Sequence, residues 1–325
     1  MKRRSMLALT ATAAAHPASV LAQAPKVYRI AVLETVPAGE NTRNFEALRQ
    51  GLRERGYVEG GNLTIEYRSA DGQAERFPAL AKELVAGGAD LIVTRGTPAA
   101  RAAKEATSTV PIVMAAIGEP LGVGVVDSLA RPGGNITGFS AYVTELAGKR
   151  VELLKGAFPS IRRVGFLQHM GNPVAPPQWE ATQQAAATLG LSAELVDVRS
   201  EAEIGTAFAG LAGRQIDALS VGIDGLTQAH GGLIIRLAAA GKVVTSYPSR
   251  EFVEAGGLLS YGPSYPDLYF RAASVIDRIL RGAKAGDIPV QQPTKLEMVI
   301  NLKTANTLGV AVPRSMLAAA DEVLE

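Results

Sequence analysis

The residues with the clearest chemical potential form a short polar segment at the end of a predicted strand. Arg95-Gly96-Thr97-Pro98 joins an apolar strand to an alanine-rich helix, with Thr97 expected as the N-cap and Pro98 as the first helical residue. The N–H groups at a helix N-terminus attract anions, so Gly96 and Thr97 are candidates for binding a ligand carboxylate. Pro98 has no N–H group and is a candidate ligand contact beside them. Ordinary helix capping explains the same residues equally well. Arg95 is either a partner of the bound anion or a surface charge.

Other candidates follow strands predicted in the first half of the chain. Glu34 and Thr35 come directly after the first strand, where Glu34 either binds a ligand ammonium group or lies in solvent. Gly118 and Glu119 follow the fourth strand, where Glu119 is either a ligand contact or an acid that stabilises a turn. The carboxyl ends of parallel strands meet at one edge of a sheet, so we expect these residues to lie near residues 96–98.

The second half of the chain offers polar residues in similar positions. Asn172 follows a predicted strand and is a candidate polar contact. Asp224 either binds a ligand amine or caps the next helix. Tyr247 follows a third strand, where its ring would stack on a ligand or its hydroxyl would form a hydrogen bond.

Composition argues against several other kinds of site. The chain has no cysteine, which removes disulfides, thiolate metal ligands and a cysteine nucleophile. Its three histidines, His16, His169 and His230, are isolated, so we expect no metal site, no catalytic triad and no cofactor. Residues 131–135 lack the glycine spacing of a nucleotide-binding loop and are predicted to form a structural turn. The net charge is +2 with acids and bases interspersed, which gives little support for nucleic-acid binding.

These candidates require a scaffold in which strands and helices alternate. Strands are predicted over 28–33, 63–68, 89–93 and 111–114, with helices over 44–55, 74–86 and 98–106. This alternation indicates a parallel sheet with helices on both faces. The pattern restarts near residue 163 with similar landmarks, which predicts two Rossmann-like α/β lobes and a ligand cleft between their strand ends. The alternative is that unrelated βαβ units share the same general pattern.

The N-terminus has the pattern of a secretory signal peptide. Residues 2–4 are basic, residues 6–21 are mostly apolar, and Ala22-Gln23-Ala24 fits the small-x-small cleavage rule. We therefore expect a signal peptide over residues 1–24 and export to the periplasm. The alternative is a short membrane anchor. The arginine pair at residues 3–4 also fits a twin-arginine signal.

Longer motifs give the chain a resemblance to a known family. They lie at residues 51–60, 128–138, 254–263, 300–305 and 320–324. In these segments the chain resembles the ABC-transporter solute-binding proteins of the type that includes the tryptophan and tyrosine binders. The resemblance covers nearly all of the mature chain. It implies the type I periplasmic-binding fold, an α/β architecture of two lobes with parallel sheets joined by a three-strand hinge.

The same resemblance implies how the chain is divided between the lobes. Three crossings are expected near residues 140–144, 261–264 and 288–294. The first lobe would comprise residues 27–140 plus 264–288, including a helix over 267–281. The second lobe would comprise residues 144–261 plus 295–325, including a strand over 295–301.

The function that the resemblance implies is solute binding for an ABC uptake transporter. The cleft would take an amino acid or another small carboxylate, and the protein would be a monomer that meets an ABC permease in the inner membrane. Neither a catalytic residue nor enzyme activity is expected. One alternative is a periplasmic sensing domain that reports ligand occupancy to a receptor. The other is an exported α/β enzyme, although the sequence shows no nucleophile paired with a base.

Overall fold

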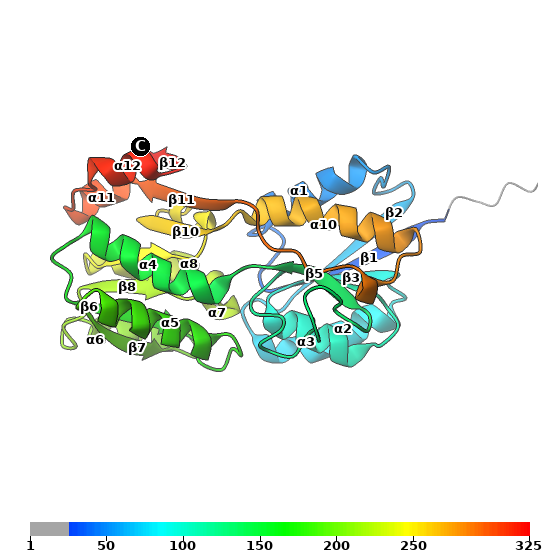
Figure 1. The fold of residues 1–325 in the computed structure, drawn as a ribbon, viewed down its shortest axis with the longest axis horizontal. Helices are drawn as coiled ribbons and strands as arrows, with labels where there is room; N and C mark the ends of the chain where they lie inside the picture. Colours follow the sequence, from blue (N-terminus) through cyan, green and yellow to red (C-terminus); the bar gives the residue numbers. More distant parts are fainter. Residues whose placement is uncertain (1–25) are drawn as a thin grey trace, which may run out of the picture.

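Two separate β-sheets organise the chain, and the computed structural model describes residues 26–325 (Figure 1). The predicted signal peptide lies outside these residues. The first sheet has five strands in the order β2 (Leu63–Ser69), β1 (Tyr28–Glu34), β3 (Leu91–Arg95), β4 (Ile112–Ile117) and β5 (Ile136–Ser140). All neighbouring strands in this sheet are parallel.

The second sheet has seven strands and one reversal of direction. Its order is β12 (Glu322–Leu324), β11 (Leu296–Asn301), β10 (Leu259–Pro263), β9 (Val244–Tyr247), β8 (Ala218–Val221), β6 (Arg163–Gln168) and β7 (Ser192–Asp197). The pair β10–β11 is antiparallel, so the expectation of wholly parallel sheets was wrong at this pair. The cause is that the chain leaves this sheet through β10 and returns to it through β11.

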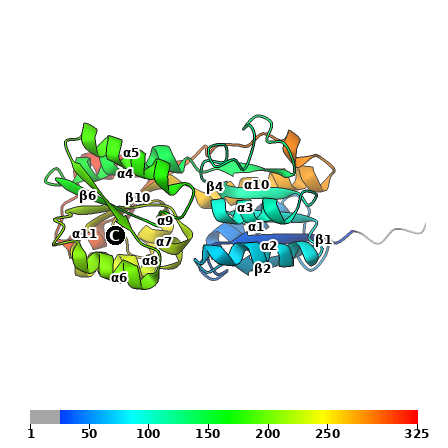
Figure 2. The same ribbon diagram turned by 90° about the horizontal axis from the view of Figure 1, so that it is seen from below.

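Helices cover both faces of each sheet (Figure 2). The first sheet packs against α1 (Thr42–Arg53), α2 (Phe77–Ala86), α3 (Thr97–Ala106) and α10 (Tyr265–Leu280). The second sheet is accompanied by α4 (Val143–Ala157), α5 (Ala175–Thr188), α6 (Glu201–Gly210), α7 (Gly225–Ala229), α8 (Gly231–Ala240), α9 (Arg250–Glu254), α11 (Leu302–Leu308) and α12 (Arg314–Ala319). Short 3-10 helices occupy Ala74–Arg76 and Ala285–Asp287. We call each sheet with its helices a lobe.

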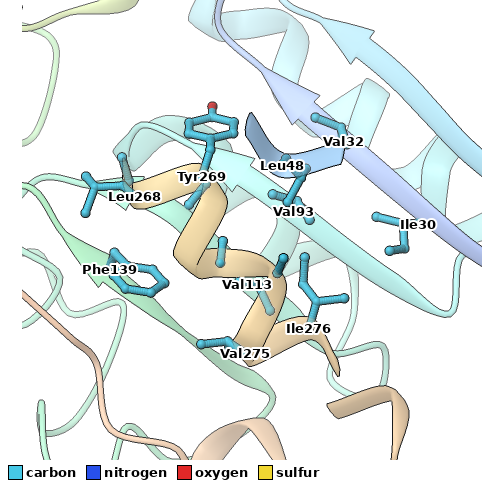
Figure 3. Close-up of a cluster of buried hydrophobic side chains, with 14 of the residues drawn as sticks. Ile30, Val32, Leu48, Val93, Val113, Phe139, Leu268, Tyr269, Val275 and Ile276 are labelled. Carbon is cyan, nitrogen blue, oxygen red and sulfur yellow. The ribbon is translucent and has the colours of Figure 1, made fainter. Parts of the chain in front are cut away.

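The core of the first lobe shows why β1 has consecutive apolar residues at its centre. Ile30 and Val32 of β1 pack in a cluster with α1 and α10, whereas Ala31 and Leu33 pack in a second cluster with α2 and α3. Successive strand residues point to opposite faces, so a strand covered on both faces needs apolar residues at consecutive positions. Figure 3 shows the first cluster, with Leu48 of α1 among its buried side chains.

The chain passes between the two sheets three times. It leaves β5 at Ser140 and enters α4 at Val143, and it leaves β10 at Pro263 and enters α10 at Tyr265. The third passage lies between Asp287 and β11, and it runs beside the first, where the Ser140 N–H donates to the Gln291 carbonyl at 2.9 Å. The expected architecture of two α/β lobes joined by three crossings is therefore confirmed (Figure 1).

No helix within residues 26–325 combines the length and the apolar character that are needed to cross a bilayer.

Candidate functional site

A cavity of about 50 Å³ lies where strand ends of the two lobes face each other. The loops after β1, β3 and β4 reach it from the first lobe, and those after β6 and β8 reach it from the second. We call this space the inner cavity. The structure places these predicted site residues on its wall: Thr35, Gly96, Thr97, Pro98, Gly118, Asn172 and Asp224.

The N-terminus of α3 lies beside the inner cavity, but its cap differs from the prediction. Gly96 is the N-cap, with φ of 82°, a backbone conformation that glycine adopts without strain. Thr97 is already helical, so the prediction that it caps α3 was wrong. Its buried hydroxyl instead donates to the carbonyl of Gly118 at 3.0 Å and so ties the loop after β4 to the start of α3. The helix dipole still presents its positive end to the cavity.

The second lobe contributes a buried carboxylate held by two hydrogen bonds. Asn172 Nδ2 donates to Asp224 Oδ2 at 2.8 Å, and the Leu226 N–H donates to Asp224 Oδ1 at 2.7 Å, which caps α7. Burial raises the pKa of Asp224, although the hydrogen bonds from Asn172 and Leu226 favour the charged form. His169 also lines the cavity, with Nδ1 4.0 Å from Asp224 Oδ1. From the sequence, His169 was expected to be an isolated histidine with no role in the site.

Arg95 lies between the lobes and is only 5% exposed, so the surface-charge interpretation was wrong. Its guanidinium stacks over the ring of Tyr265 at 4.4 Å, and Nη1 donates to Asn41 Oδ1 at 3.2 Å. Burial opposes the charge of Arg95, but the fields of Tyr269, Glu34 and Glu251 outweigh it and raise the pKa. Within residues 26–325, no carboxylate oxygen comes within 4.0 Å of this guanidinium.

A direct hydrogen bond joins the two lobes at the edge of the inner cavity. Thr35 Oγ1 of the first lobe donates to Gln228 Oε1 of the second at 3.0 Å. Nearby, a Cβ on Gly72 would lie 2.7 Å from the Cβ of Ala229, so the two backbones approach closely there. The structure is therefore a closed arrangement of the lobes.

A second and larger cavity lies next to the first between the same lobes. It has a volume of about 490 Å³, and we call it the outer cavity. Val36 reaches it from the first lobe, while the start of α8 and Glu251 and Phe252 of α9 reach it from the second. Arg95 and Gln228 lie on the walls of both cavities. Sequence reasoning missed the α8 residues because α8 follows another helix, α7, and it missed Glu251 and Phe252 because only Tyr247 was chosen near the end of β9.

Three predicted contacts lie away from both cavities. Glu34 is fully buried and accepts a hydrogen bond from the hydroxyl of Tyr269, and burial raises its pKa. It is the last residue of a central strand, so neighbouring strands and α10 cover it. Glu119 lies in the turn after β4 with φ of 47°, outside the cavity walls.

Tyr247 is also displaced from its predicted place. It is 0% exposed, stacks on Phe252 with ring centroids 5.0 Å apart, and accepts a hydrogen bond from Thr245 at 3.0 Å. Strand β9 extends to this residue, so Tyr247 belongs to the core of the second lobe. Its placement in the cleft was wrong.

Comparison with known proteins agrees with this geometry. Residues 29–324 match the family model described as ABC transporter substrate binding protein, and the chain belongs to that family. A curated relative, the "Tyrosine-binding protein" of Clostridioides difficile (strain R20291), is 29% identical over 259 residues, which are 80% of this chain and 74% of the relative.

Two solved structures resemble the whole fold closely. One is an ABC domain from Streptococcus pneumonia in complex with L-Trp, with 31% identity and a TM-score of 0.85. The other is a conserved domain protein from Vibrio cholerae, with 28% identity and a TM-score of 0.86. Each comparison covers 92% of this chain and 100% of the other. The expected family and its function as the substrate-binding protein of an ABC transporter are thus confirmed.

Proposed function

We propose that this protein binds an amino acid, or another small carboxylate, between its lobes and delivers it to an ABC permease in the inner membrane. The observation that carries the proposal is the opposition of charge across the inner cavity. Arg95 and the N-terminus of α3 lie on the first lobe, and the Asp224 carboxylate lies on the second. A zwitterion satisfies both sides at once, with its carboxylate at Arg95 and its ammonium group at Asp224.

The connections between the lobes support capture by closure. Three short crossings allow the lobes to rotate about a hinge while each sheet stays intact. In this proposal the first lobe comprises residues 27–140 plus 264–288, and the second comprises residues 144–261 plus 295–325. The membership of the strands in the two sheets supports that division.

The proposal also includes the place where the protein acts. The basic, apolar and small-residue pattern over residues 1–24 supports export to the periplasm through a cleavable signal, of the general or the twin-arginine type. The mature protein would act as a monomer and carry its ligand without chemical turnover. The resemblance to a tyrosine-binding protein and to an L-Trp complex supports an amino acid as the ligand.

The direct test is a screen of the mature protein by thermal unfolding against amino acids, aromatic acids and sugars. An amino acid at about 100 times its dissociation constant should raise stability by about 2.7 kcal/mol. Stabilisation by a sugar, with none by any amino acid or carboxylate, would contradict the proposal.

A variant pair then tests the carboxylate site. Arg95→Lys keeps the positive charge but loses the planar pair of donors, so affinity for the amino acid should fall by at least about tenfold. Arg131→Gln changes an exposed arginine away from the cavities and should leave affinity unchanged. Isothermal titration calorimetry of both variants, each first checked for wild-type unfolding behaviour, gives the comparison. Equal affinities in Arg95→Lys and wild type would show that the ligand does not use this guanidinium.

A further inference from the structure

The two cavities of the cleft differ greatly in size. The inner cavity measures about 50 Å³ and the outer one about 490 Å³. A single water molecule requires roughly 10–15 Å³ of such space, so the inner cavity holds only a few non-hydrogen atoms. Sites for small organic ligands usually measure roughly 300–1,000 Å³, and the outer cavity falls in that range. A ligand with a long side chain therefore cannot lie wholly in the inner cavity of the closed structure.

The junction of the two cavities carries the only side chains that line both of them within the described chain, Arg95 and Gln228. Gln228 is held by its hydrogen bond from Thr35. Arg95 is buried, with its Nη1 bonded to Asn41 and no carboxylate within 4.0 Å among residues 26–325. A guanidinium has five N–H donors, so Arg95 retains donors for a carboxylate at the junction.

We propose that the closed protein holds an α-amino acid across this junction, with its ammonium group in the inner cavity and its side chain in the outer cavity. The carboxylate lies at Arg95. An α-amino acid has its carboxylate on the carbon that also bears the amine and the side chain, so its two other substituents diverge from the junction. Asp224 supplies the carboxylate for the ammonium group on the inner side. This inference rests on the proposed function, and it adds that the wall of the outer cavity determines which amino-acid side chains the protein accepts.

The outer cavity has a wall suited to that selection. Val36 and Phe252 supply apolar surface, and both are buried. Glu251 and Arg236 supply charges of both signs. Residues of α8 and α9, rather than the residues at the strand ends, then determine which amino acids bind.

Two glycines allow each cavity to be narrowed separately. A Cβ at Gly232, in the first turn of α8, would meet only Arg236 Nη1 at 3.5 Å, which is an ordinary contact. Gly232 lines the outer cavity alone. A Cβ at Gly225, on the inner cavity, would lie 3.6 Å from Thr35 Cγ2. Neither glycine has a positive φ, so larger residues fit the backbone at both positions.

The experiment compares affinities by calorimetry for glycine, L-alanine, L-leucine and L-phenylalanine. Gly232→Leu should weaken binding of the two long amino acids by at least about tenfold relative to wild type and change binding of the two short ones little. Gly225→Ala should weaken all the amino acids that bind wild type by a similar factor. Gly205→Leu, in open space on α6 away from both cavities, is the matched control and should change none of them.

The outcomes separate this inference from the function on which it rests. If wild type binds none of a full amino-acid panel, the proposed function fails and this inference fails with it. If wild type binds an amino acid but Gly232→Leu leaves every affinity unchanged, or lowers short and long ligands alike, only the side-chain assignment is wrong. Selective loss of the long amino acids in Gly225→Ala instead would place the side chain in the inner cavity and overturn the proposed orientation.

Discussion

The positive charge of one buried arginine at the cleft acts on two carboxyl groups from different lobes. Among the described residues Arg95 forms no ion pair within 4.0 Å, yet its charge lowers the pKa of both Glu34 and Glu251 relative to burial alone. Burial raises the pKa of Glu34 despite that field. For Glu251, burial acts in the same direction, but Arg95 and local hydrogen bonds outweigh it and lower the pKa. Of these two carboxyl groups, Glu34 is thus the one whose protonated form is favoured.

The pH dependence of stability follows from the raised pKa of Glu34. A carboxyl group whose folded pKa exceeds its unfolded value stabilises the fold at low pH, and this contribution is lost as pH rises through the folded pKa. Glu34→Gln removes the titration. The free energy of unfolding of wild type relative to this variant should therefore fall as pH rises above the ordinary value of 4.5. Urea unfolding of both proteins across that range measures it, and a difference independent of pH would contradict the assignment.

Asp224 should determine whether the ligand needs an amine. Asp224→Asn keeps the acceptor that caps α7 but removes the negative charge. Affinity for the amino acid should fall by at least about tenfold, while the corresponding acid without the amine should bind wild type and variant equally. Calorimetry with the two ligands measures both effects, and Asp127→Asn, an exposed position, is the control. An equal loss for both ligands would mean that Asp224 serves only as a helix cap.

Sequence reasoning found the part of the site that follows from strand ends. Gly96, Asn172 and Asp224 reached the inner cavity because parallel strands place their carboxyl ends together. The predicted contacts of Tyr247 and Glu34 with the ligand do not agree with the structure for a related reason. Each is the last residue of its strand and is still buried by neighbouring elements. The position of a strand end is uncertain by a residue or two in a sequence, and that difference decides whether a side chain enters a cleft or a core.

At the scale of the elements, α1 and α10 approach each other closely at a glycine. A Cβ on Gly51 would lie 2.6 Å from the carbonyl oxygen of Phe270 and 2.7 Å from the Cβ of Ala273. These are contacts that a folded chain does not tolerate without movement of the backbone. The residue type at position 51 therefore sets the distance between the two helices.

Replacement of this glycine should separate packing from helix propensity. Gly51→Ala should lower the free energy of unfolding by about 1–3 kcal/mol, because the added methyl group overpacks the contact with α10. Gly205→Ala lies in α6 with open space around it and should raise stability by about 0.5–1 kcal/mol through helix propensity alone. Urea unfolding measures the free energy of unfolding of both variants. A stabilised Gly51→Ala protein would show that α10 moves away from α1 at little cost.

The local pattern of apolar residues predicted most helices and strands. Which strands pair, and in which direction, depends on the path of the chain between them. The apolar runs at β1, β3 and β4 are recognisable because a strand covered on both faces is apolar at successive positions. The antiparallel pair β10–β11 has no such signal, since direction depends on where the intervening chain travels. Placement of α10 on the first lobe came from the family resemblance, because amphipathic spacing alone does not say which sheet a helix covers.

At the scale of the whole molecule, polar contacts across the cleft favour closure. Asn44 Nδ2 donates to Glu251 Oε1 at 3.1 Å, and Thr35 donates to Gln228. Arg43 forms an ion pair with Glu254 at the exposed rim. The partly buried Asn44–Glu251 hydrogen bond should stabilise the closed form more than the exposed Arg43–Glu254 ion pair does, because solvent screens charges at the rim.

Glu251→Gln should shift the unliganded protein toward an open form. It retains an acceptor for Asn44 but removes the charge attracted to Arg95 across the lobes. Small-angle X-ray scattering should show a larger radius of gyration than wild type without ligand, and saturating ligand should restore the compact value. Glu254→Gln is the matched rim control and should scatter like wild type. Identical curves for Glu251→Gln and wild type would show that this charge does not hold the lobes together.

The place of α10 has a consequence for how the protein is made. One face of the N-terminal sheet is covered by α1 together with α10, and α10 (Tyr265–Leu280) is missing from that face until most of the chain has left the ribosome. A nascent polypeptide that ends before this helix presents apolar β-strands to its surroundings. We expect such intermediates to need chaperones during synthesis, and early stop codons to yield aggregated fragments instead of a shortened working lobe.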